Sequence, residues 1–407
     1  MTLIKCFTTS HIDNISACLR LKPEKMILVG DADTMGEAVP RYRALLSCRG
    51  LTTKISLCDT RGQDFDDLCK VLWHLTAKEE YPVIDLTGGN EAAILSVGAV
   101  IAQLEPQVRQ KIRVEQFDRK VDCVIDCLTG KPVYPQIQVA LRVEELIALH
   151  GGILCGDSYQ PAADCTPADL ETLWQLVMKD PKEWNLWMQT LGEFERCSVG
   201  SDRMTIFIDF LGSNPASLLK KECRMRAILS QLERCGVLED YSDQDCLLYT
   251  YTSPLMRHCA AKAGNILELK VLLEGRAARE NGASYFHDCR MSVNIDWDGI
   301  INDGIPKVQE TRNEIDVVLM RGCTPLFISC KNGSIDDEEL YKLNTVANRF
   351  GGPHVGKMLI AAKLDRKSET ANESFAQRAW DMDIFLVENT ATLSGQDWMK
   401  HFKSAMP

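Results

Sequence analysis

The sequence predicts an α/β protein built from two different α/β units and a connecting region. In the first hundred residues, short apolar segments typical of strands alternate with segments typical of helices. Near the C-terminal third, two neighbouring apolar segments carry charged residues at alternate positions. A turn-rich stretch that begins at Gly151 separates these two parts. We therefore expect domains at residues 1–150, 151–252 and 253–407.

The N-terminal segments predict a parallel sheet with helices on its faces. Strands are expected at residues 3–7, 26–29, 53–57 and 82–86, and helices at residues 12–21, 35–46, 65–75 and 92–102. In such a fold, ligands bind beyond the carboxyl ends of the strands.

Two loops follow these strand ends. One contains Thr8, Thr9, Ser10 and His11, and the other contains Thr87, Gly88, Gly89 and Asn90. The second loop opens directly into a helix, where free backbone N–H groups favour an anion and the glycines permit close approach. The alternative is a plain connection between a strand and a helix. Because the GxGxxG fingerprint is absent, hydride transfer on a dinucleotide is not favoured.

The region from 151 to 252 is harder to interpret. Two tryptophan-bearing helical segments are followed by a strand at 205–210, a helix at 216–232 and a strand at 247–251. A helix followed by a short strand permits a winged-helix fold. Without a recognition-helix pattern, a structural connector is the preferred interpretation.

The two charged apolar segments, 313–320 and 325–331, predict a hairpin because four residues separate them. Glu314 and Asp316 share one strand face, and Ser329 shares a face with Lys331. Carboxylates beside a lysine suit a metal-dependent phosphodiesterase, in which the acids hold Mg²⁺ or Mn²⁺ and the lysine orients water. A surface hairpin with a salt bridge is the alternative.

Two flanking helices add acids to this group. Glu268 lies in an apolar helix at 264–273, where an unpaired carboxylate is costly. In the helix at 336–350, Glu339 falls within the apolar stripe and Glu338 falls opposite it. Glu339 is therefore expected to point inward.

This order of elements resembles the PD-(D/E)xK nuclease superfamily. The resemblance implies that Glu268 is the acid of the first helix, Asp316 the central acid and Lys331 the catalytic lysine. Ser329 stands where the second acid of (D/E)xK belongs. Glu339 is the first candidate to replace that acid as a metal ligand beside Glu268 and Asp316, and Glu314 is the second. A degenerate, inactive nuclease fold is the alternative.

The N-terminal loop that begins at Asp85 and ends at Asn90 resembles the ligand loop of Rossmann-like CARF sensor domains, which bind cyclic oligoadenylates across a homodimer. Glu91 follows, where these relatives commonly have a lysine. With the C-terminal hairpin, nearly the whole chain resembles the CARF and PD-(D/E)xK effector nucleases of type III CRISPR antiviral systems. That resemblance implies an activator, with cyclic tetra-adenylate first among the candidates.

Composition adds constraints. The net charge of −11 argues against broad coating of nucleic acid, which needs many cations. The seventeen cysteines show no CxxC spacing and fall mostly in apolar segments, so free thiols in a reducing cytoplasm are expected. No signal peptide or membrane-spanning run is visible, so no membrane partner is expected.

Together these features predict a cytoplasmic, homodimeric nuclease that a cyclic oligoadenylate activates and that cuts single-stranded RNA or DNA with Mn²⁺ or Mg²⁺. The competing hypothesis is a ligand-sensing regulator that binds nucleic acid without cutting it. A third hypothesis, an unregulated repair or restriction nuclease, leaves the sensor half unexplained.

Overall fold

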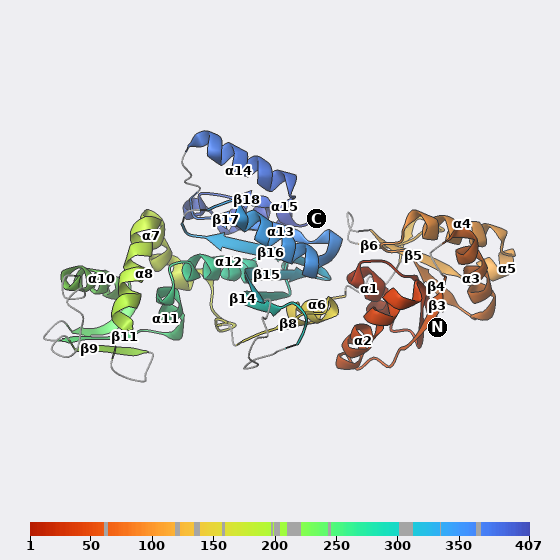
Figure 1. Cartoon of the computed structure of the whole chain (residues 1–407), viewed down its shortest axis with the longest axis horizontal. Helices are drawn as coiled ribbons and strands as arrows, with labels where there is room; N and C mark the ends of the chain where they lie inside the picture. The colour runs from red at the N-terminus through yellow and green to blue at the C-terminus, as the bar shows by residue number, and fades with distance from the viewer. Residues whose placement is uncertain are drawn as a thin grey trace.

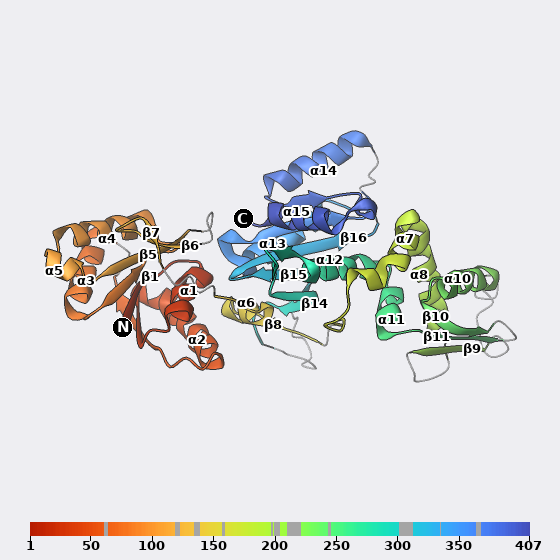
Figure 2. The same cartoon turned by 180° about the vertical axis from the view of Figure 1, so that it is seen from behind.

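The structure, a computed structural model, describes residues 1–60, 64–118, 123–133, 139–156, 159–196, 198, 204–209, 221–242, 246–300, 312–333, 335–363 and 368–407. Three bodies lie in a row (Figure 1). The N-terminal domain occupies one end, the C-terminal sheet the centre, and the middle region of the sequence the other end, as the reverse view also shows (Figure 2). No helix in the described ranges is long and apolar enough to cross a membrane.

The N-terminal domain contains a seven-stranded sheet in the order β3-β2-β1-β4-β5-β6-β7. The first five strands in this order are parallel, as predicted, and β6 and β7 extend the sheet antiparallel. The strands are β1 (Thr2–Cys6), β2 (Lys25–Gly30), β3 (Lys54–Asp59), β4 (Pro82–Asp85), β5 (Arg113–Asp118), β6 (Cys123–Asp126) and β7 (Lys131–Pro132).

Helices cover both faces of this sheet because alternate strand residues are apolar on each side. Leu3, Met26 and Leu28 face one apolar cluster together with α1 (His11–Leu21) and α2 (Ala32–Cys48). Ile4, Ile27 and Ile84 face a second cluster with α3 (Phe65–Lys78) and α4 (Glu91–Gln103). The short helix α5 (Pro106–Arg109) precedes β5.

Helix α6 (Val143–Leu149) joins the N-terminal domain to the centre of the molecule (Figure 1). One apolar cluster runs without interruption from α1 and α2 through α6 into the C-terminal sheet. The strand after α6, β8 (Ile153–Leu154), pairs with the C-terminal sheet. The two outer parts of the sequence are therefore in direct contact, and the predicted boundary at residue 150 falls between α6 and β8.

The middle region forms a helical cluster on a small antiparallel sheet in the order β10-β11-β9. Its tryptophan-bearing helices form where predicted, and their Trp174 and Trp184 are buried in its core. The predicted helix start at 216 and strand end at 210 lie outside the described residues. The elements are η1 (Pro167–Leu170), α7 (Glu171–Lys179), α8 (Pro181–Glu195), β9 (Thr205–Asp209), α10 (Glu222–Arg234), β10 (Leu238–Ser242), β11 (Cys246–Tyr251) and α11 (Pro254–Ala261).

The C-terminal domain contains a six-stranded sheet in the order β18-β17-β16-β15-β14-β8. The predicted hairpin is confirmed: Arg321 pairs with Thr324, and Gly322 takes the left-handed conformation (φ 60°) that a tight turn requires. The strands are β14 (Asp288–Asp296), β15 (Arg312–Arg321), β16 (Thr324–Lys331), β17 (Gly356–Ala361) and β18 (Phe385–Val387), with a small separate pair β12 (Arg279–Glu280) and β13 (Ala283–Ser284).

Helices cover both faces of this sheet as well. One face packs on α12 (Asn265–Ala277) and α15 (Gly395–Ala405), and the other on α13 (Glu338–Gly351) and α14 (Glu369–Asp381). The short helices η2 (Gly352–His354) and η3 (Thr390–Thr392) complete the domain. The catalytic candidates lie on α12, β15, β16 and α13.

Candidate functional sites

Asp316 is the best-defined acid of the C-terminal site. Its Oδ2 accepts a hydrogen bond from the backbone N–H of Cys330 at 2.6 Å and another from the Ser329 hydroxyl at 3.2 Å. Burial raises its pKa above the usual value, and these two donors together with Lys331 act in the opposite direction. Its other oxygen, Oδ1, accepts no hydrogen bond from the described residues. One edge of the carboxylate is thus fixed to β16, and the other is open.

Ser329 therefore helps to hold the Asp316 carboxylate in place. It stands in the position of the missing acid, is 9% exposed, and donates its hydroxyl proton to the carboxylate across the hairpin. A hydroxyl in this place orients the acid, but it adds no negative charge with which to hold a metal.

Glu268, near the start of α12, lies close enough to Asp316 for the two charges to interact. Burial, assisted by the negative charges of Asp316 and Glu314, raises the pKa of Glu268 to about 8. Lys262 and Lys331 act against this shift. Glu314 itself is exposed and lies two residues before Asp316 on the same strand. Glu268, Asp316 and Glu314 thus lie within range of one another's negative charge, and a nearby cation would stabilise their ionised forms.

Lys331 and Glu339 form an ion pair at 2.8 Å. As predicted, Glu339 is the inward-facing acid of α13, because it is 24% exposed whereas Glu338 is 68% exposed. Glu339 nevertheless faces the lysine rather than the other acids. Within the described ranges, no three His, Cys, Asp or Glu side chains gather closely enough to hold a metal ion. A metal held by Glu268, Asp316 and Glu339 together would require Glu339 to leave Lys331.

The site residues still suit a hard divalent cation held by fewer protein ligands. Asp316 Oδ1 and the Glu268 carboxylate receive no hydrogen bond from the described part of the chain. Mg²⁺ commonly binds through one or two carboxylates and takes its other ligands from water and phosphate. Glu268 and Asp316 match that donor set.

In the N-terminal domain, the two predicted ligand loops lie together because their strands, β1 and β4, are parallel neighbours. They also touch: a Cβ placed on Gly88 would lie 2.5 Å from Asp13 Oδ2, and Gly88 has a positive φ of 69°. Only glycine fits at this position without strain. The N-termini of α1 and α4 therefore open at the same edge of the sheet.

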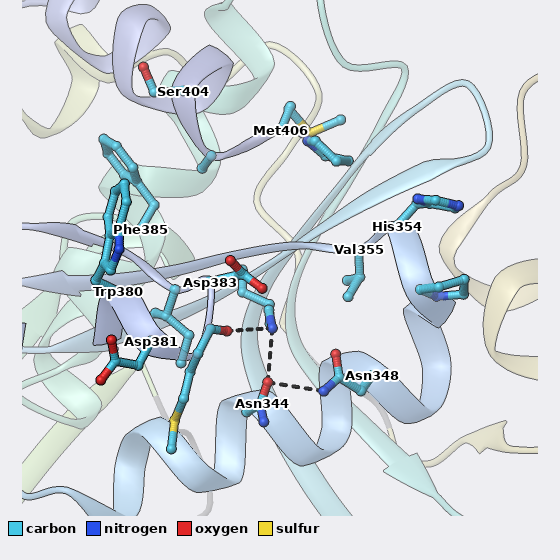
Figure 3. Close-up of a pocket in the computed structure, with 16 residues that line it drawn as sticks. Asn344, Asn348, His354, Val355, Trp380, Asp381, Asp383, Phe385, Ser404 and Met406 are labelled. Carbon is cyan, nitrogen blue, oxygen red and sulfur yellow. Dashed lines mark hydrogen bonds between the residues drawn. The ribbon is translucent and has the colours of Figure 1, made fainter. Parts of the chain in front are cut away.

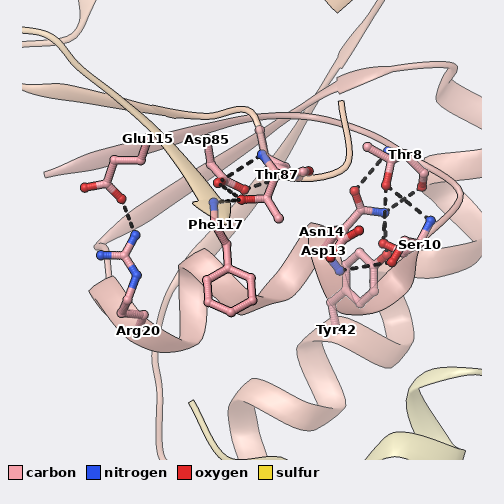
Figure 4. Close-up of polar contacts among 11 residues, drawn as sticks. Thr8, Ser10, Asp13, Asn14, Arg20, Tyr42, Asp85, Thr87, Glu115 and Phe117 are labelled. Atoms are coloured by element: carbon pink, nitrogen blue, oxygen red, sulfur yellow. Dashed lines mark hydrogen bonds and ion pairs between the residues drawn. The ribbon is translucent and has the colours of Figure 1, made fainter. Parts of the chain in front are cut away.

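Several of the predicted loop side chains are used within the loops themselves (Figure 4). Ser10 caps α1 by accepting from the Asp13 N–H at 3.3 Å, and Asn90 caps α4 by accepting from the Ala93 N–H at 2.9 Å. Thr87 is buried, donates to Asp85 Oδ1 at 2.7 Å and accepts from the Phe117 N–H at 2.9 Å.

The remaining predicted loop residues differ in exposure. Thr8 is half-buried and exchanges two hydrogen bonds with the Asn14 side chain, at 2.9 and 2.7 Å. Gly89 is half-buried, and a Cβ there would lie 3.1 Å from the Leu86 carbonyl oxygen. Thr9, Gly88 and Glu91 are exposed. A bound ligand would therefore meet these exposed positions and the backbone N–H groups of the two helix starts.

His11 is half-buried against Tyr42 and α6. Its Nδ1 lies 2.9 Å from the Tyr42 hydroxyl, and its ring packs edge-on against His150 of α6 with centroids 5.3 Å apart. Burial lowers the pKa of His11 to about 3 and that of His150 to about 4. Both rings are thus neutral at neutral pH and form the contact between the sensor loop and α6.

A buried ion pair beneath the second loop was not predicted from the sequence. Lys5 and Asp85 are paired in register on β1 and β4, and Lys5 Nζ lies 2.8 Å from Asp85 Oδ2. Their side chains are 0% and 2% exposed. Lys5 also donates to the Thr87 carbonyl oxygen. A lysine in the middle of an apolar strand was the available signal, because such a charge needs a partner.

No family model matches this sequence, and no curated protein matches it. Solved structures do match across the whole chain. Protein VC1899 from Vibrio cholerae superposes with a TM-score of 0.69 at 17% identity, covering 99% of this chain and 97% of that one. Can2 from Sulfobacillus thermosulfidooxidans, solved in complex with cyclic tetra-adenylate, superposes with a TM-score of 0.63 at 14% identity, covering 100% of each chain.

These matches confirm the predicted fold. The chain has the same architecture from end to end as VC1899 and Can2. At this level of identity the likeness concerns the fold, and function must be argued from the site residues.

Proposed function

We propose that this protein is a CARF-type effector of a type III CRISPR antiviral system, in which a cyclic oligoadenylate controls a divalent-metal nuclease. The observation that carries the proposal is the group formed by Glu268, Asp316 and Lys331 at the end of the C-terminal hairpin. The whole-chain likeness to Can2, solved with cyclic tetra-adenylate, supports the choice of activator.

For the chemistry, Glu268 and Asp316 would hold Mg²⁺ or Mn²⁺, which supplies Lewis-acid activation of the phosphate and of the attacking water. Ser329 and the Cys330 N–H keep Asp316 in place. Lys331, once its ammonium is free, orients the water and offsets charge that develops on the phosphate. Glu339 binds that ammonium at 2.8 Å in the present state. A resting enzyme in which Glu339 holds the catalytic lysine fits a nuclease that needs an activator.

On the sensor side, the activator is proposed to contact the backbone N–H groups at the starts of α1 and α4 and the exposed Thr9 and Gly88. Helix N-termini favour phosphates. Glu91 opposes them, since an exposed carboxylate in the first turn of α4 repels an anion.

A homodimer is part of this proposal. Ile94 and Leu95 on α4 are 42% and 64% exposed although both are apolar, and they follow the ligand loop directly. A second copy of the chain that packed on this helix would cover them and place two ligand loops around one ring-shaped activator.

Coupling between the two sites is proposed to pass through α6 and α13. His11 contacts His150 at the end of α6, and a Cβ on Gly352, just after α13, would lie 3.8 Å from His150 Nε2. The other end of α13 carries Glu339, which holds Lys331. A shift of the sensor loop would thus be transmitted along one helix to the catalytic lysine.

The test is cleavage of single-stranded RNA, single-stranded DNA and plasmid with Mn²⁺, with and without each cyclic oligoadenylate. We expect cutting that depends on both metal and activator, and no cutting by Asp316→Ala or Lys331→Ala, which should fold normally. Near-normal cutting by either variant would contradict the assignment of the site.

The second candidate function is a ligand-sensing regulator that binds nucleic acid without cutting. Ser329 in place of an acid favours it. Activator-dependent binding of nucleic acid without any cleavage in Mn²⁺ would support this second function.

A further inference from the structure

A cavity of about 630 Å³ in the C-terminal domain lies apart from the acids and from the ligand loops. It is formed by α13, the start of β17, the end of α14 and the C-terminal residues. Its volume is typical of small-molecule sites. Figure 3 shows Asn344 and Asn348 on one side of it and Trp380 and Phe385 on another.

The polar side of this cavity is built around a buried cation. Lys357 is 7% exposed and donates to Asn344 Oδ1 at 2.9 Å and to the Met382 carbonyl oxygen at 2.6 Å. An ammonium has three protons, and the third has no acceptor among the described residues. One charged donor is therefore available to a ligand.

The orientation of both asparagines follows from this lysine. Lysine can only donate, so the Asn344 atom beside it must be the oxygen. The same oxygen accepts from Asn348 Nδ2 at 3.0 Å, which leaves Asn348 Oδ1 as an acceptor and Asn344 Nδ2 as a donor. The cavity thus offers both donors and acceptors that are fixed in direction.

The aromatic side is unusual because Trp380 is 78% exposed. An indole exposed to this extent loses the benefit of burial unless something covers it. Asp381 and Asp383 also line the cavity, so its carboxylates outnumber the single ammonium of Lys357. This charge balance disfavours a phosphate inside the cavity and favours a neutral, flat group that stacks on indole and hydrogen-bonds at its edge, with any attached phosphate outside.

We propose that this cavity binds an unpaired base of the substrate strand, stacked on Trp380 and bonded at its edge by Asn348 and Lys357. The inference rests on the proposed function for the identity of the substrate. Bases of single strands stack on aromatic side chains in this way, whereas bases in a duplex are not accessible.

The position of the cavity suits the same strand that reaches the acids. Lys357 is paired in register with Phe327, four residues before Lys331 on β16. At about 3.3 Å per residue, the Cα atoms of the two lysines are offset by about 13 Å along the strand direction, and the β16 residues between them are buried. A nucleic-acid strand that reaches both places would therefore pass over the outside of the domain, and the cavity would hold a base at least several nucleotides from the scissile phosphate.

The test measures binding of fluorescent single-stranded octamers (dA, dC, dT and the corresponding RNAs) in EDTA, where no cutting occurs. Trp380→Ala should weaken binding about 5- to 150-fold, the range expected from loss of one stacked base, and Trp380→Phe should restore most of it. The matched control is Trp73→Ala, which removes an indole that is 43% exposed on the sensor domain. This control should bind as the wild type does.

Equal binding by wild type and Trp380→Ala, or no binding by the wild type, would overturn the inference. So would an equal loss of duplex binding, since a paired base cannot enter. A change in oligomeric state on sedimentation without a change in strand binding would show that a second copy covers Trp380 instead. If octamers bind through Trp380 but metal and activator produce no cutting, the proposed nuclease fails and this inference stands.

Discussion

Replacing Lys5 by methionine should destabilise the N-terminal domain far more than an ordinary ion-pair substitution does. Methionine keeps a similar length and removes only the charged end. In the structure, the Lys5 side chain is 0% exposed, and its ammonium lies 2.8 Å from Asp85 and also bonds the Thr87 carbonyl oxygen. Lys5→Met therefore leaves a carboxylate, 2% exposed, without its cation.

The size of the effect follows from burial. Removing one partner of a buried pair costs about 3–5 kcal/mol, because the remaining charge has no solvent. At about 2–4 °C per kcal/mol for a domain of this size, the melting temperature should fall by about 6–20 °C. Lys25, on the neighbouring strand β2, is the matched control: it is paired with Glu79 at 2.7 Å, but it is 36% exposed. Lys25→Met should cost no more than about 1 kcal/mol.

The assay is urea unfolding of Lys5→Met, Asp85→Asn and the double variant, compared with Lys25→Met. The double variant should be more stable than the sum of the single losses predicts, since it leaves no unpaired charge. Binding of cyclic tetra-adenylate should weaken in Lys5→Met about tenfold or more, because the Thr87 carbonyl loses a charged donor. A loss of stability in Lys5→Met no larger than that in Lys25→Met would refute the reasoning.

Three further predictions concern the C-terminal site and the ligand loop. If Glu339 restrains Lys331 at 2.8 Å, Glu339→Gln should raise cutting without activator several-fold, and Glu338→Gln should leave it unchanged. If Glu339 is instead a metal ligand, Glu339→Gln should abolish cutting. The pKa of Glu268 is about 8 in the folded chain and near 4.5 in the unfolded chain. Between these pH values the metal-free folded chain therefore binds more protons than the unfolded chain. Its stability should fall as pH rises through this window. Thermal unfolding from pH 5 to pH 8 should show a smaller slope in Glu268→Gln, and Mn²⁺ should raise the melting temperature more at pH 8 than at pH 6. Gly88→Ala should weaken activator binding while leaving the metal-dependent stabilisation intact, since a Cβ there would lie 2.5 Å from Asp13 Oδ2; unchanged binding would place the activator elsewhere.

The sequence allowed the hairpin and its polar face to be predicted because strands have a period of two. That period predicts that Glu314 and Asp316 share one strand face and that Ser329 and Lys331 share another. The helical period places Glu339 inward and Glu338 outward, as their exposures confirm. Neither period determines the position of α13 along the sheet. The partner of Glu339 is set by that tertiary placement, so its pairing with Lys331 could not be predicted.

The same limit applies to the ligand loops. Their place at the carboxyl ends of parallel strands follows from the alternation of strands and helices, and the contact between Gly88 and Asp13 is consistent with it. The packing of His11 depends instead on α6, which lies more than 130 residues later and offers His150 as a partner. Local sequence contains no information on that long-range contact.

Two lysine–carboxylate pairs of equal length have opposite consequences in this molecule. Lys5–Asp85 and Lys331–Glu339 are both 2.8 Å long, but the first is buried and the second is 28% and 24% exposed. Breaking the buried pair would leave a charge that is neither paired nor hydrated, which is energetically costly. The loop that this pair supports therefore stays in one arrangement. The partly exposed pair stabilises the folded chain by about 1 kcal/mol or less. A small change in packing, or a phosphate that competes for the lysine, can offset a free energy of this size. A ligand that distinguishes two arrangements of the protein by only a few kcal/mol could therefore release Lys331 while the sensor loop remains intact.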